Sequence, residues 1–323
     1  MDNLTHSLTG LAMARAGLDR LSPRATALLI LSANLPDVDA VGLLHSPLQY
    51  LKFHRGYTHS ILGLPIISLL AVLIVAALFR QTLPWGKAWM LCAIGVASHL
   101  LIDWTNDYGI RLLLPFSSKW FALDINSLYD GAIMAALVFA ALWPYLEGLV
   151  NGEIGDKRPA GRGTAVFALL FFVSYDGGRA LMHNRAVNQL QSVLYDGESP
   201  LQAAALPNPF NPFRWKGVVE TSRSYRLVPV DAVGQLEPEN ALLFYKPSFR
   251  KTLESAKRTE PFRYFLYFAR FPVWSEDKTL NGEERTVRIE LSDLRFGLPG
   301  AGLFHCEAIE DGQGHLLKSE FKF

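Results

Sequence analysis

The run ILGLPIISLLAVLIVAALF, residues 61–79, contains 19 residues and no charged side chain. A helix rises ~1.5 Å per residue, so this run has the length needed to cross the ~30 Å hydrocarbon core of a bilayer. The sequence therefore predicts a transmembrane helix here, and with it an integral membrane protein.

Three further apolar segments are shorter, but each continues into mixed sequence and carries a Trp or Tyr of the kind that favours membrane interfaces. They are residues 88–102, 131–146 and 164–175. Together with the first run they predict about four transmembrane helices. Residues 25–35 (ATALLILSANL) are too few to span a bilayer and predict a short buried or re-entrant helix near the N-terminus.

The character of the chain changes after about residue 183. Turn-forming residues in LPNPFNPF, residues 206–213, precede segments in which apolar and polar residues alternate. Because alternation with period two is typical of strands, we predict an α-helical integral membrane domain over residues 1–183, followed by a small, mainly β soluble domain over residues 184–323. The segments expected to form strands are residues 215–228, 262–271, 285–291 and 303–308.

Composition excludes several classes of protein. Half of the residues are hydrophobic and 19% are charged, with a formal net charge of +1. Such a chain has no global basic field to hold nucleic acid, so we expect no nucleic-acid partner. Cys92 and Cys306 are the two cysteines, and they cannot form a disulfide framework or a thiolate metal site.

The short loops give an orientation for the predicted spans. The loop at residues 151–163 carries three basic residues, and the loop at residues 80–87 has one at each end. The positive-inside rule places both in the cytoplasm. Residues 1–60, residues 106–130 and the C-terminal domain are then expected on the outer side. Five basic residues near the N-terminus weigh against this orientation, namely Arg15, Arg20, Arg24, Lys52 and Arg55.

Five of the eight histidines fall before residue 100, in and around the first predicted spans. Among them, His99 and Asp103 are four residues apart and so project from one face of a helix. Ionisable groups at such depth are expensive unless they pair or bind something, so this pair predicts a functional site. The alternative is a buried ion pair that fixes helix packing.

Two carboxylates follow Pro36 in the stretch NLPDVD. Asp37 and Asp39 are separated by one residue, and an extended or turn conformation after proline lets both face one ion. Alternatively, this stretch is a loop with an Asx turn. His6 is a further candidate ligand, for which the alternative is a surface or capping role.

The stretch HRGYTHS places two more histidines just before the first span. His54 and His59 are five residues apart, a spacing that does not suit one helical face, so we expect them in a loop that enters the span. Between them, Arg55 is a candidate clamp for a phosphate or another anion.

A mixed set of His and Asp ligands without thiolate suits zinc, manganese or iron, and the number of carboxylates favours more than one ion. Such a site activates a bound water, which implies hydrolysis of an ester or phosphoester. Asp130 and Arg179 lie on the same predicted side and are expected to contact the substrate or support the ligands. Alternatively, Arg179 forms a structural pair with Asp176, three residues before it.

The order of NLTH at the N-terminus, NLPDVD, HRGYTHS and HLLIDWTNDYG, followed by Asp130, resembles the YdjM-like family of inner-membrane proteins described as metal-dependent hydrolases, some of them LexA-regulated. The resemblance covers roughly the first 130 residues. It implies a bacterial inner-membrane location. The metal ligands it implies are His6, Asp37, His54, His59, His99 and Asp103.

We therefore expect a membrane-bound metal-dependent hydrolase that acts on a phosphoester or ester of a lipid or envelope component, with its site and C-terminal domain on the periplasmic side. One or two divalent ions, zinc before manganese or iron, would be held by the six ligands above and Asp39. The expected catalytic residues are Asp39, Arg55, Asp130 and Arg179. The alternative is a non-catalytic membrane scaffold or envelope-maintenance protein with a structural metal site. A transporter is disfavoured, because four spans without an inverted repeat give little material for alternating access. The oligomeric state stays open.

Overall fold

The computed structural model describes residues 1–154, 161–247, 251–281, 284–301, 304–311 and 313–323. The chain forms two compact units, each discontinuous in sequence. The first, here the membrane unit, comprises Met1–Asp39, Arg55–Met182 and Pro207–Pro212; the second, here the β unit, comprises Ala40–His54, His183–Leu206 and Phe213–Phe323. The domain boundary expected at residue 183 falls inside a helix, α7. Most of the basic loop used for orientation, residues 155–160, lies outside the described residues.

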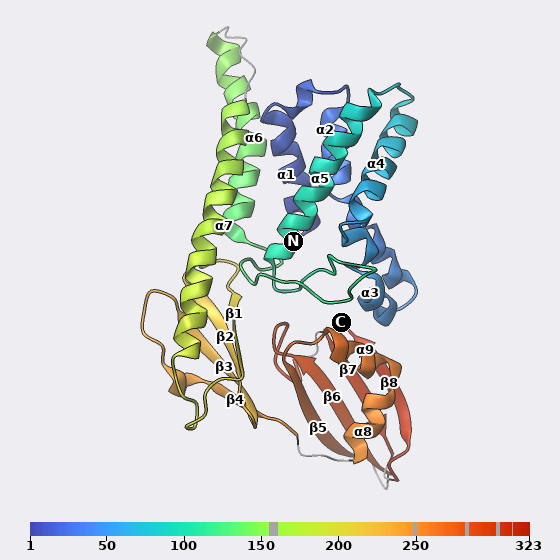
Figure 1. The fold of residues 1–323 in the computed structure, drawn as a ribbon, viewed down its shortest axis with the longest axis vertical. Coiled ribbons are helices and arrows are strands. Elements are labelled where there is room, and N and C mark those ends of the chain that lie inside the picture. The colour runs from blue at the N-terminus through green and yellow to red at the C-terminus, as the bar shows by residue number, and fades with distance from the viewer. Residues whose placement is uncertain (155–160, 248–250, 282–283, 302–303, 312) are drawn as a thin grey trace. The chain divides into compact units, whose positions relative to one another are not determined.

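The membrane unit is helical (Figure 1). Among the described residues, three helices, α5, α6 and α7, are long and apolar enough to span a membrane, and the number rises to five if two bent helix pairs each form one span. The predicted fold class is confirmed, and the expected four spans lie within this range. The helices are α1 (Asn3–Arg15), α2 (Ala25–Ser32), α4 (Gly63–Phe79), α5 (Trp85–Thr105), α6 (Gly131–Ile154) and α7 (Arg162–Gln191), with 3-10 helices η1 (Leu18–Arg20), η2 (Leu35–Leu44, which continues into the β unit) and η3 (Tyr57–His59).

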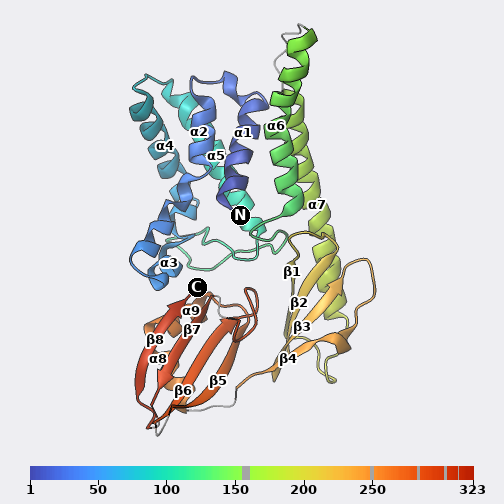
Figure 2. The same cartoon turned by 180° about the vertical axis from the view of Figure 1, so that it is seen from behind.

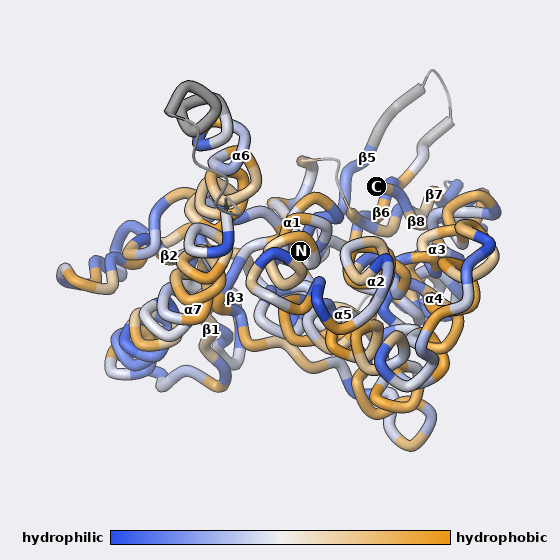
Figure 3. The backbone as a smooth tube through the Cα atoms, turned by 90° about the horizontal axis from the view of Figure 1, so that it is seen from above, coloured by the Kyte–Doolittle hydropathy of each residue, from blue (hydrophilic) through white to orange (hydrophobic). Residues whose placement is uncertain are grey.

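The uncharged run at residues 61–79 contains α4, which has 17 residues. It meets the length criterion for a span only when it is combined with the preceding helical segment Pro47–His59. Its outward side chains include Ile66, Leu73 and Leu78, all of them exposed in the isolated chain. Hydrophobic residues also run along α6 and α7, as the hydropathy colouring in Figure 3 shows. Exposed apolar faces of this kind are what a lipid environment requires.

Close helix packing around α2 depends on two glycines. A Cβ atom on Gly10 of α1 would lie 2.9 Å from the Leu29 carbonyl oxygen and 3.0 Å from the Ile30 Cα of α2. A Cβ atom on Gly95 of α5 would lie 3.1 Å from the same carbonyl oxygen. Small residues let helix backbones approach closely in membranes, and here they draw α1 and α5 onto α2.

Gly10→Ala is expected to lower the free energy of unfolding by about 1–3 kcal/mol, because the added methyl meets backbone atoms that cannot rotate away. Thermal unfolding of the detergent-purified chain measures this change. Gly86→Ala in α5 is the matched control, since nothing lies within 4 Å of its added Cβ. Equal melting temperatures for both variants would contradict the packing argument.

Basic residues gather at one end of the membrane unit. Arg162, at the start of α7, donates from Nε to the Ala16 carbonyl oxygen at 3.1 Å, just beyond the end of α1. The Arg24 guanidinium lies 4.4 Å from the centroid of the Phe79 ring, at the end of α4. This finding corrects the expectation that residues 1–60 all share one side. The α1–α2 hairpin carries the chain from the N-terminus to the far end of the bundle and back (Figure 1).

The β unit holds two four-stranded antiparallel sheets, in the strand orders β1-β2-β3-β4 and β5-β6-β7-β8 (Figure 2). Apolar side chains from both sheets, among them Val218 of β2 and Val273 of β5, share one core cluster. The strands are β1 (Gln202–Pro207), β2 (Arg214–Glu220), β3 (Ser224–Asp231), β4 (Leu242–Tyr245), β5 (Pro272–Asn281), β6 (Glu284–Asp293), β7 (His305–Glu310) and β8 (Leu316–Lys322), and the helices are α3 (Pro47–Phe53), η4 (Pro238–Asn240), α8 (Lys251–Arg258) and α9 (Glu260–Phe268).

One predicted strand is wrong. Most of residues 262–271 form α9 instead, and the buried side chains Phe262, Phe265 and Phe268 recur every three residues along it. That spacing places them on one helical face, whereas the mixture of aromatic and polar residues imitates alternation. The segment at residues 215–228 becomes the β2–β3 hairpin, and residues 285–291 lie in β6.

Candidate metal centre

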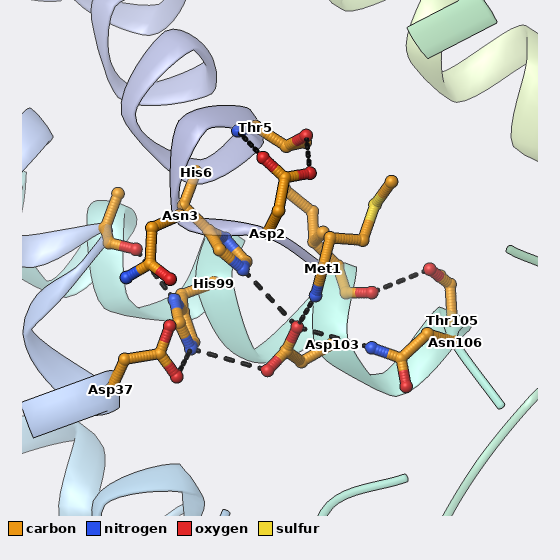
Figure 4. A network of polar contacts seen from close by, with 12 residues as sticks. Met1, Asp2, Asn3, Thr5, His6, Asp37, His99, Asp103, Thr105 and Asn106 are labelled. Atoms are coloured by element: carbon orange, nitrogen blue, oxygen red, sulfur yellow. Dashed lines mark hydrogen bonds and ion pairs between the residues drawn. The ribbon is translucent and has the colours of Figure 1, made fainter. Parts of the chain in front are cut away.

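Four side chains converge near the C-terminal end of α5. They are Asp37 from η2, His59 from η3, and His99 and Asp103 from α5. One ligand atom from each lies within 4.8 Å of the others, and three of the four residues are fully buried. Figure 4 shows Asp37, His99 and Asp103 turned toward one another. Four of the candidate ligands that the sequence suggests therefore lie together in one group within the described residues.

The separations between the donor atoms are narrow in range. His59 Nε2 lies 3.0 Å from His99 Nε2, 3.3 Å from Asp37 Oδ1 and 3.5 Å from Asp103 Oδ2. His99 Nε2 lies 3.6 Å from Asp37 Oδ1 and 3.5 Å from Asp103 Oδ2. Donor atoms bound at ~2.0–2.1 Å to one tetrahedral ion are about 3.3–3.4 Å apart, so these residues fit a zinc-sized ion.

Each of the two histidine rings is held in place by contacts of its Nδ1 atom, on the side of the ring that faces away from the cluster. His99 Nδ1 lies 2.7 Å from the Ala33 carbonyl oxygen, which requires a proton on Nδ1 and leaves the lone pair of Nε2 facing the cluster. His59 Nδ1 lies 3.2 Å from Asp39 Oδ2 and 3.0 Å from Thr58 Oγ1. A carboxylate behind a ligating histidine is a common arrangement in metal sites. In this structure Asp39 therefore contacts the back of His59.

Asp103 is shared between the cluster and its surroundings (Figure 4). Its Oδ1 accepts from the amino group of Met1 and lies 3.3 Å from His6 Nε2. The His6 ring stacks on His99, with ring centroids 3.9 Å apart. His6 thus lies beside the four-donor group and outside it, and its role as a ligand stays a prediction.

Arg55 contacts the carboxylate of Asp103 from the other side. Its Nη2 lies 3.1 Å from Asp103 Oδ2, its Nη1 donates to Asn106 Oδ1 at 2.9 Å, and its guanidinium lies 4.8 Å from the centroid of the Tyr108 ring. The backbone of Arg55 has a φ of +57°, in the left-handed region. The expected anion clamp is therefore engaged with protein groups, and a contact with substrate stays a prediction.

His54 belongs to the β unit. It ends α3, and its ring stacks on Tyr50 with centroids 4.5 Å apart. Its predicted role as a metal ligand stays a prediction.

Asp130 and Arg179 form a separate cluster in the membrane unit. Asp130 Oδ1 caps α6 by accepting from the backbone N–H groups of Ala132 and Ile133. Arg179 is almost fully buried, donates to the Ile125 carbonyl oxygen at 2.7 Å, and lies 3.5 Å from Asp130 Oδ2. These contacts fix the start of α6 against α7, and the predicted catalytic roles of both residues stay predictions.

Asn106 is a site residue that the sequence reasoning did not assign. Fully buried, it accepts from Arg55 through Oδ1 and lies within 3.4 Å of Asp103 through Nδ2. The same Oδ1 accepts from the backbone N–H of Tyr108 and Gly109 and so shapes the turn after α5. Its position three residues after Asp103, at a helix end, is a signal that was present in the sequence.

Comparisons with known proteins place this geometry in a family. One relative is uncharacterized protein YfhP from Bacillus subtilis, which is 28% identical over 93% of this chain and 88% of that protein. Another is inner membrane protein YbcI from Escherichia coli, which is 30% identical over 36% of this chain and 69% of that protein. The match to the Bacillus protein includes most of the β unit. No solved structure matches the chain. A model of the YdjM inner membrane protein family matches residues 1–186, more than half of the sequence and all four residues of the metal cluster. The chain belongs to the YdjM inner membrane protein family.

Proposed function

We propose that this inner-membrane protein is a metal-dependent hydrolase whose metal ion is held by Asp37, His59, His99 and Asp103. Zinc is the first choice for this ion, and manganese or iron the second. The observation that carries the proposal is the set of donor separations of 3.0–3.6 Å around the two histidine Nε2 atoms. Two neutral imidazoles and two carboxylates match the ligand preference of such ions and neutralise their charge.

The residues in and around the cluster have different roles in the proposed reaction. A bound divalent ion supplies an acidified water and neutralises negative charge that develops on an ester or phosphoester. Asp37 is 12% exposed in its side chain whereas the other three donors are fully buried, so a substrate approaches from the side of Asp37. Asp39 orients His59, and Arg55 holds Asp103 in place. This division keeps the ligands in position without help from the substrate.

The surroundings of the cluster favour a lipid substrate. The three elements that carry the cluster residues each expose a large apolar side chain as well. Apolar surface on these elements suits an amphiphile, whose polar head group would reach the ion while the rest stays in an apolar environment. The exposed side chains are Val38 of η2, Tyr57 of η3 and Leu101 of α5.

We place the cluster on the periplasmic side. The basic end of the membrane unit lies at the opposite end of α1 from His6, and the positive-inside rule assigns a basic end to the cytoplasm. Three N-terminal arginines that weighed against this orientation in the sequence now support it, because the α1–α2 hairpin carries them to that end. The basic residues at this end are Arg15, Arg20, Arg24, Arg80 and Arg162.

Metal content and turnover of the detergent-purified chain test the proposal. We expect stoichiometric zinc, manganese or iron and chelator-sensitive hydrolysis of phosphatidic acid, bis-p-nitrophenyl phosphate or p-nitrophenyl acetate. Asp37→Asn is expected to lower turnover by about a hundredfold or more, since it replaces a charged carboxylate donor with a neutral amide. Asp19→Asn, which changes an exposed carboxylate in η1, is the matched control.

The alternative is a scaffold with a structural metal site, and one observation favours it. Four protein donors, three of them fully buried, are the number that a closed structural zinc site uses. Bound metal without turnover of any of the three probes would support this alternative. Absence of stoichiometric metal would contradict both functions.

A further inference from the structure

A segment in the middle of the site sequence belongs to the other unit. Asp39 and Arg55 are part of the membrane unit, whereas the intervening residues Ala40–His54 are part of the β unit. The two flanking residues meet, since the backbone N–H of Arg55 donates to Asp39 Oδ2 at 3.0 Å. The segment is therefore a loop that leaves the site and returns to it through a hydrogen-bonded base.

The loop is internally tight. A Cβ atom on Gly42 would lie 3.1 Å from the carbonyl oxygen of Gln49 and 3.3 Å from the Cα of Tyr50, so the first part of the loop packs directly on the backbone of α3. Ser46 caps α3 by accepting from the backbone N–H of Gln49. The two arms of the loop are therefore packed against each other as one compact piece.

Contacts within the β unit hold α3. The Lys52 ammonium pairs with Glu260 of α9, and the Tyr264 hydroxyl, also from α9, donates to the Lys52 carbonyl oxygen at 3.2 Å. Tyr50 meets the ring of Phe323, just past β8, edge to face with centroids 5.0 Å apart. Backbone, charge and ring contacts thus tie one short helix to two elements of the β unit.

We propose that the β unit is a positioning module that sets the conformation of the metal cluster through α3. The base of the loop is a shared carboxylate oxygen, because Asp39 Oδ2 accepts from Arg55 N–H and Thr58 Oγ1 and lies 3.2 Å from His59 Nδ1. A shift of α3 disturbs this oxygen and with it the orientation of the His59 ring. Of the β unit, Ala40–His54 lies inside the family match, whereas most of the remainder follows it in sequence.

Hydrogen exchange of the full chain tests the coupling without any metal. Tyr264→Phe combined with Lys52→Ala removes the hydrogen bond and the ion pair and leaves the aromatic ring of residue 264 in place. Exchange in a peptide covering residues 55–60 is expected to become about five- to tenfold faster, the effect of losing one hydrogen bond and a partly exposed ion pair. Tyr245→Phe, which changes an exposed tyrosine of β4, is the matched control.

A second arm of the experiment rests on the proposed function. The same double variant is expected to bind zinc about tenfold more weakly, the lower end of the effect of disturbing groups behind a ligand. Faster exchange over residues 47–53 with unchanged exchange over residues 55–60 would overturn the coupling. Unchanged exchange in both peptides would also overturn it, because α3 would then not be held by these contacts. Failure of wild-type protein to bind zinc would instead overturn the proposed function and leave the exchange result to decide the coupling.

Discussion

His99→Ala is expected to lower zinc affinity by more than about a hundredfold, since changes behind a ligand alone cost ten- to hundredfold. The side chain supplies an Nε2 donor 3.0 Å from the Nε2 atom of His59 and 3.5 Å from Asp103 Oδ2. Its removal leaves three donors and a fully buried space where the ring was. Isothermal titration of the chelator-treated chain with zinc measures the change.

Two further variants grade this result. Asp39→Asn keeps all four donors but replaces the carboxylate behind His59, so it is expected to cost only about ten- to hundredfold in zinc affinity. His315→Ala changes a histidine of the β unit that is 72% exposed and should leave affinity unchanged. If His99→Ala bound zinc as tightly as His315→Ala, the four-donor site would be refuted.

The fold follows from the sequence where a single periodic signal dominates. The long uncharged run predicts α4, and the alternation of apolar and polar residues over residues 215–228 predicts β structure. The prediction fails at residues 262–271, where phenylalanines three residues apart also resemble an alternating pattern. The assignment of Ala40–His54 to the β unit is a tertiary fact. It depends on contacts with α9 more than 200 residues away in sequence, which no local pattern encodes.

The site was partly predictable for a similar reason. His99 and Asp103 are adjacent on one helix, so spacing alone places them together. Asp37 and His59 join them through the packing of η2 and η3, which spacing does not determine. The pair of carboxylates one residue apart suggests two ligands of one ion, and a carboxylate oxygen of Asp37 lies within 4.8 Å of one of Asp39. The contact of Asp39 with His59 Nδ1 is a tertiary fact that the spacing of the two carboxylates does not encode.

Asp103→Asn is expected to lower the free energy of unfolding by about 3–5 kcal/mol, the usual cost of removing one partner from a buried ion pair. Arg55 and Asp103 are both buried, with side chains 4% and 0% exposed, and their charged atoms are 3.1 Å apart. Without the carboxylate, the guanidinium retains Asn106 and the Tyr108 ring but has lost its opposite charge. Thermal or denaturant unfolding in detergent with excess chelator measures the loss without any contribution from a bound ion.

The partner variant separates this ion pair from the metal site. Arg55→Gln alone leaves Asp103 uncompensated on that side, so it should also destabilise the metal-free chain strongly. The double variant Arg55→Gln with Asp103→Asn removes both charges of the pair, so neither charge remains buried without its partner. Its destabilisation should therefore be smaller than the sum of the two single effects by about 1–3 kcal/mol. Additive effects would mean that Arg55 and Asp103 do not interact. Zinc affinity should distinguish the two single variants although both destabilise the chain, because Asp103 supplies a ligand atom to the proposed site and Arg55 does not. The Arg55→Gln variant should therefore bind zinc more tightly than the Asp103→Asn variant, even if the two variants unfold at the same temperature. Equal zinc affinities would contradict the assignment of Asp103 as a ligand.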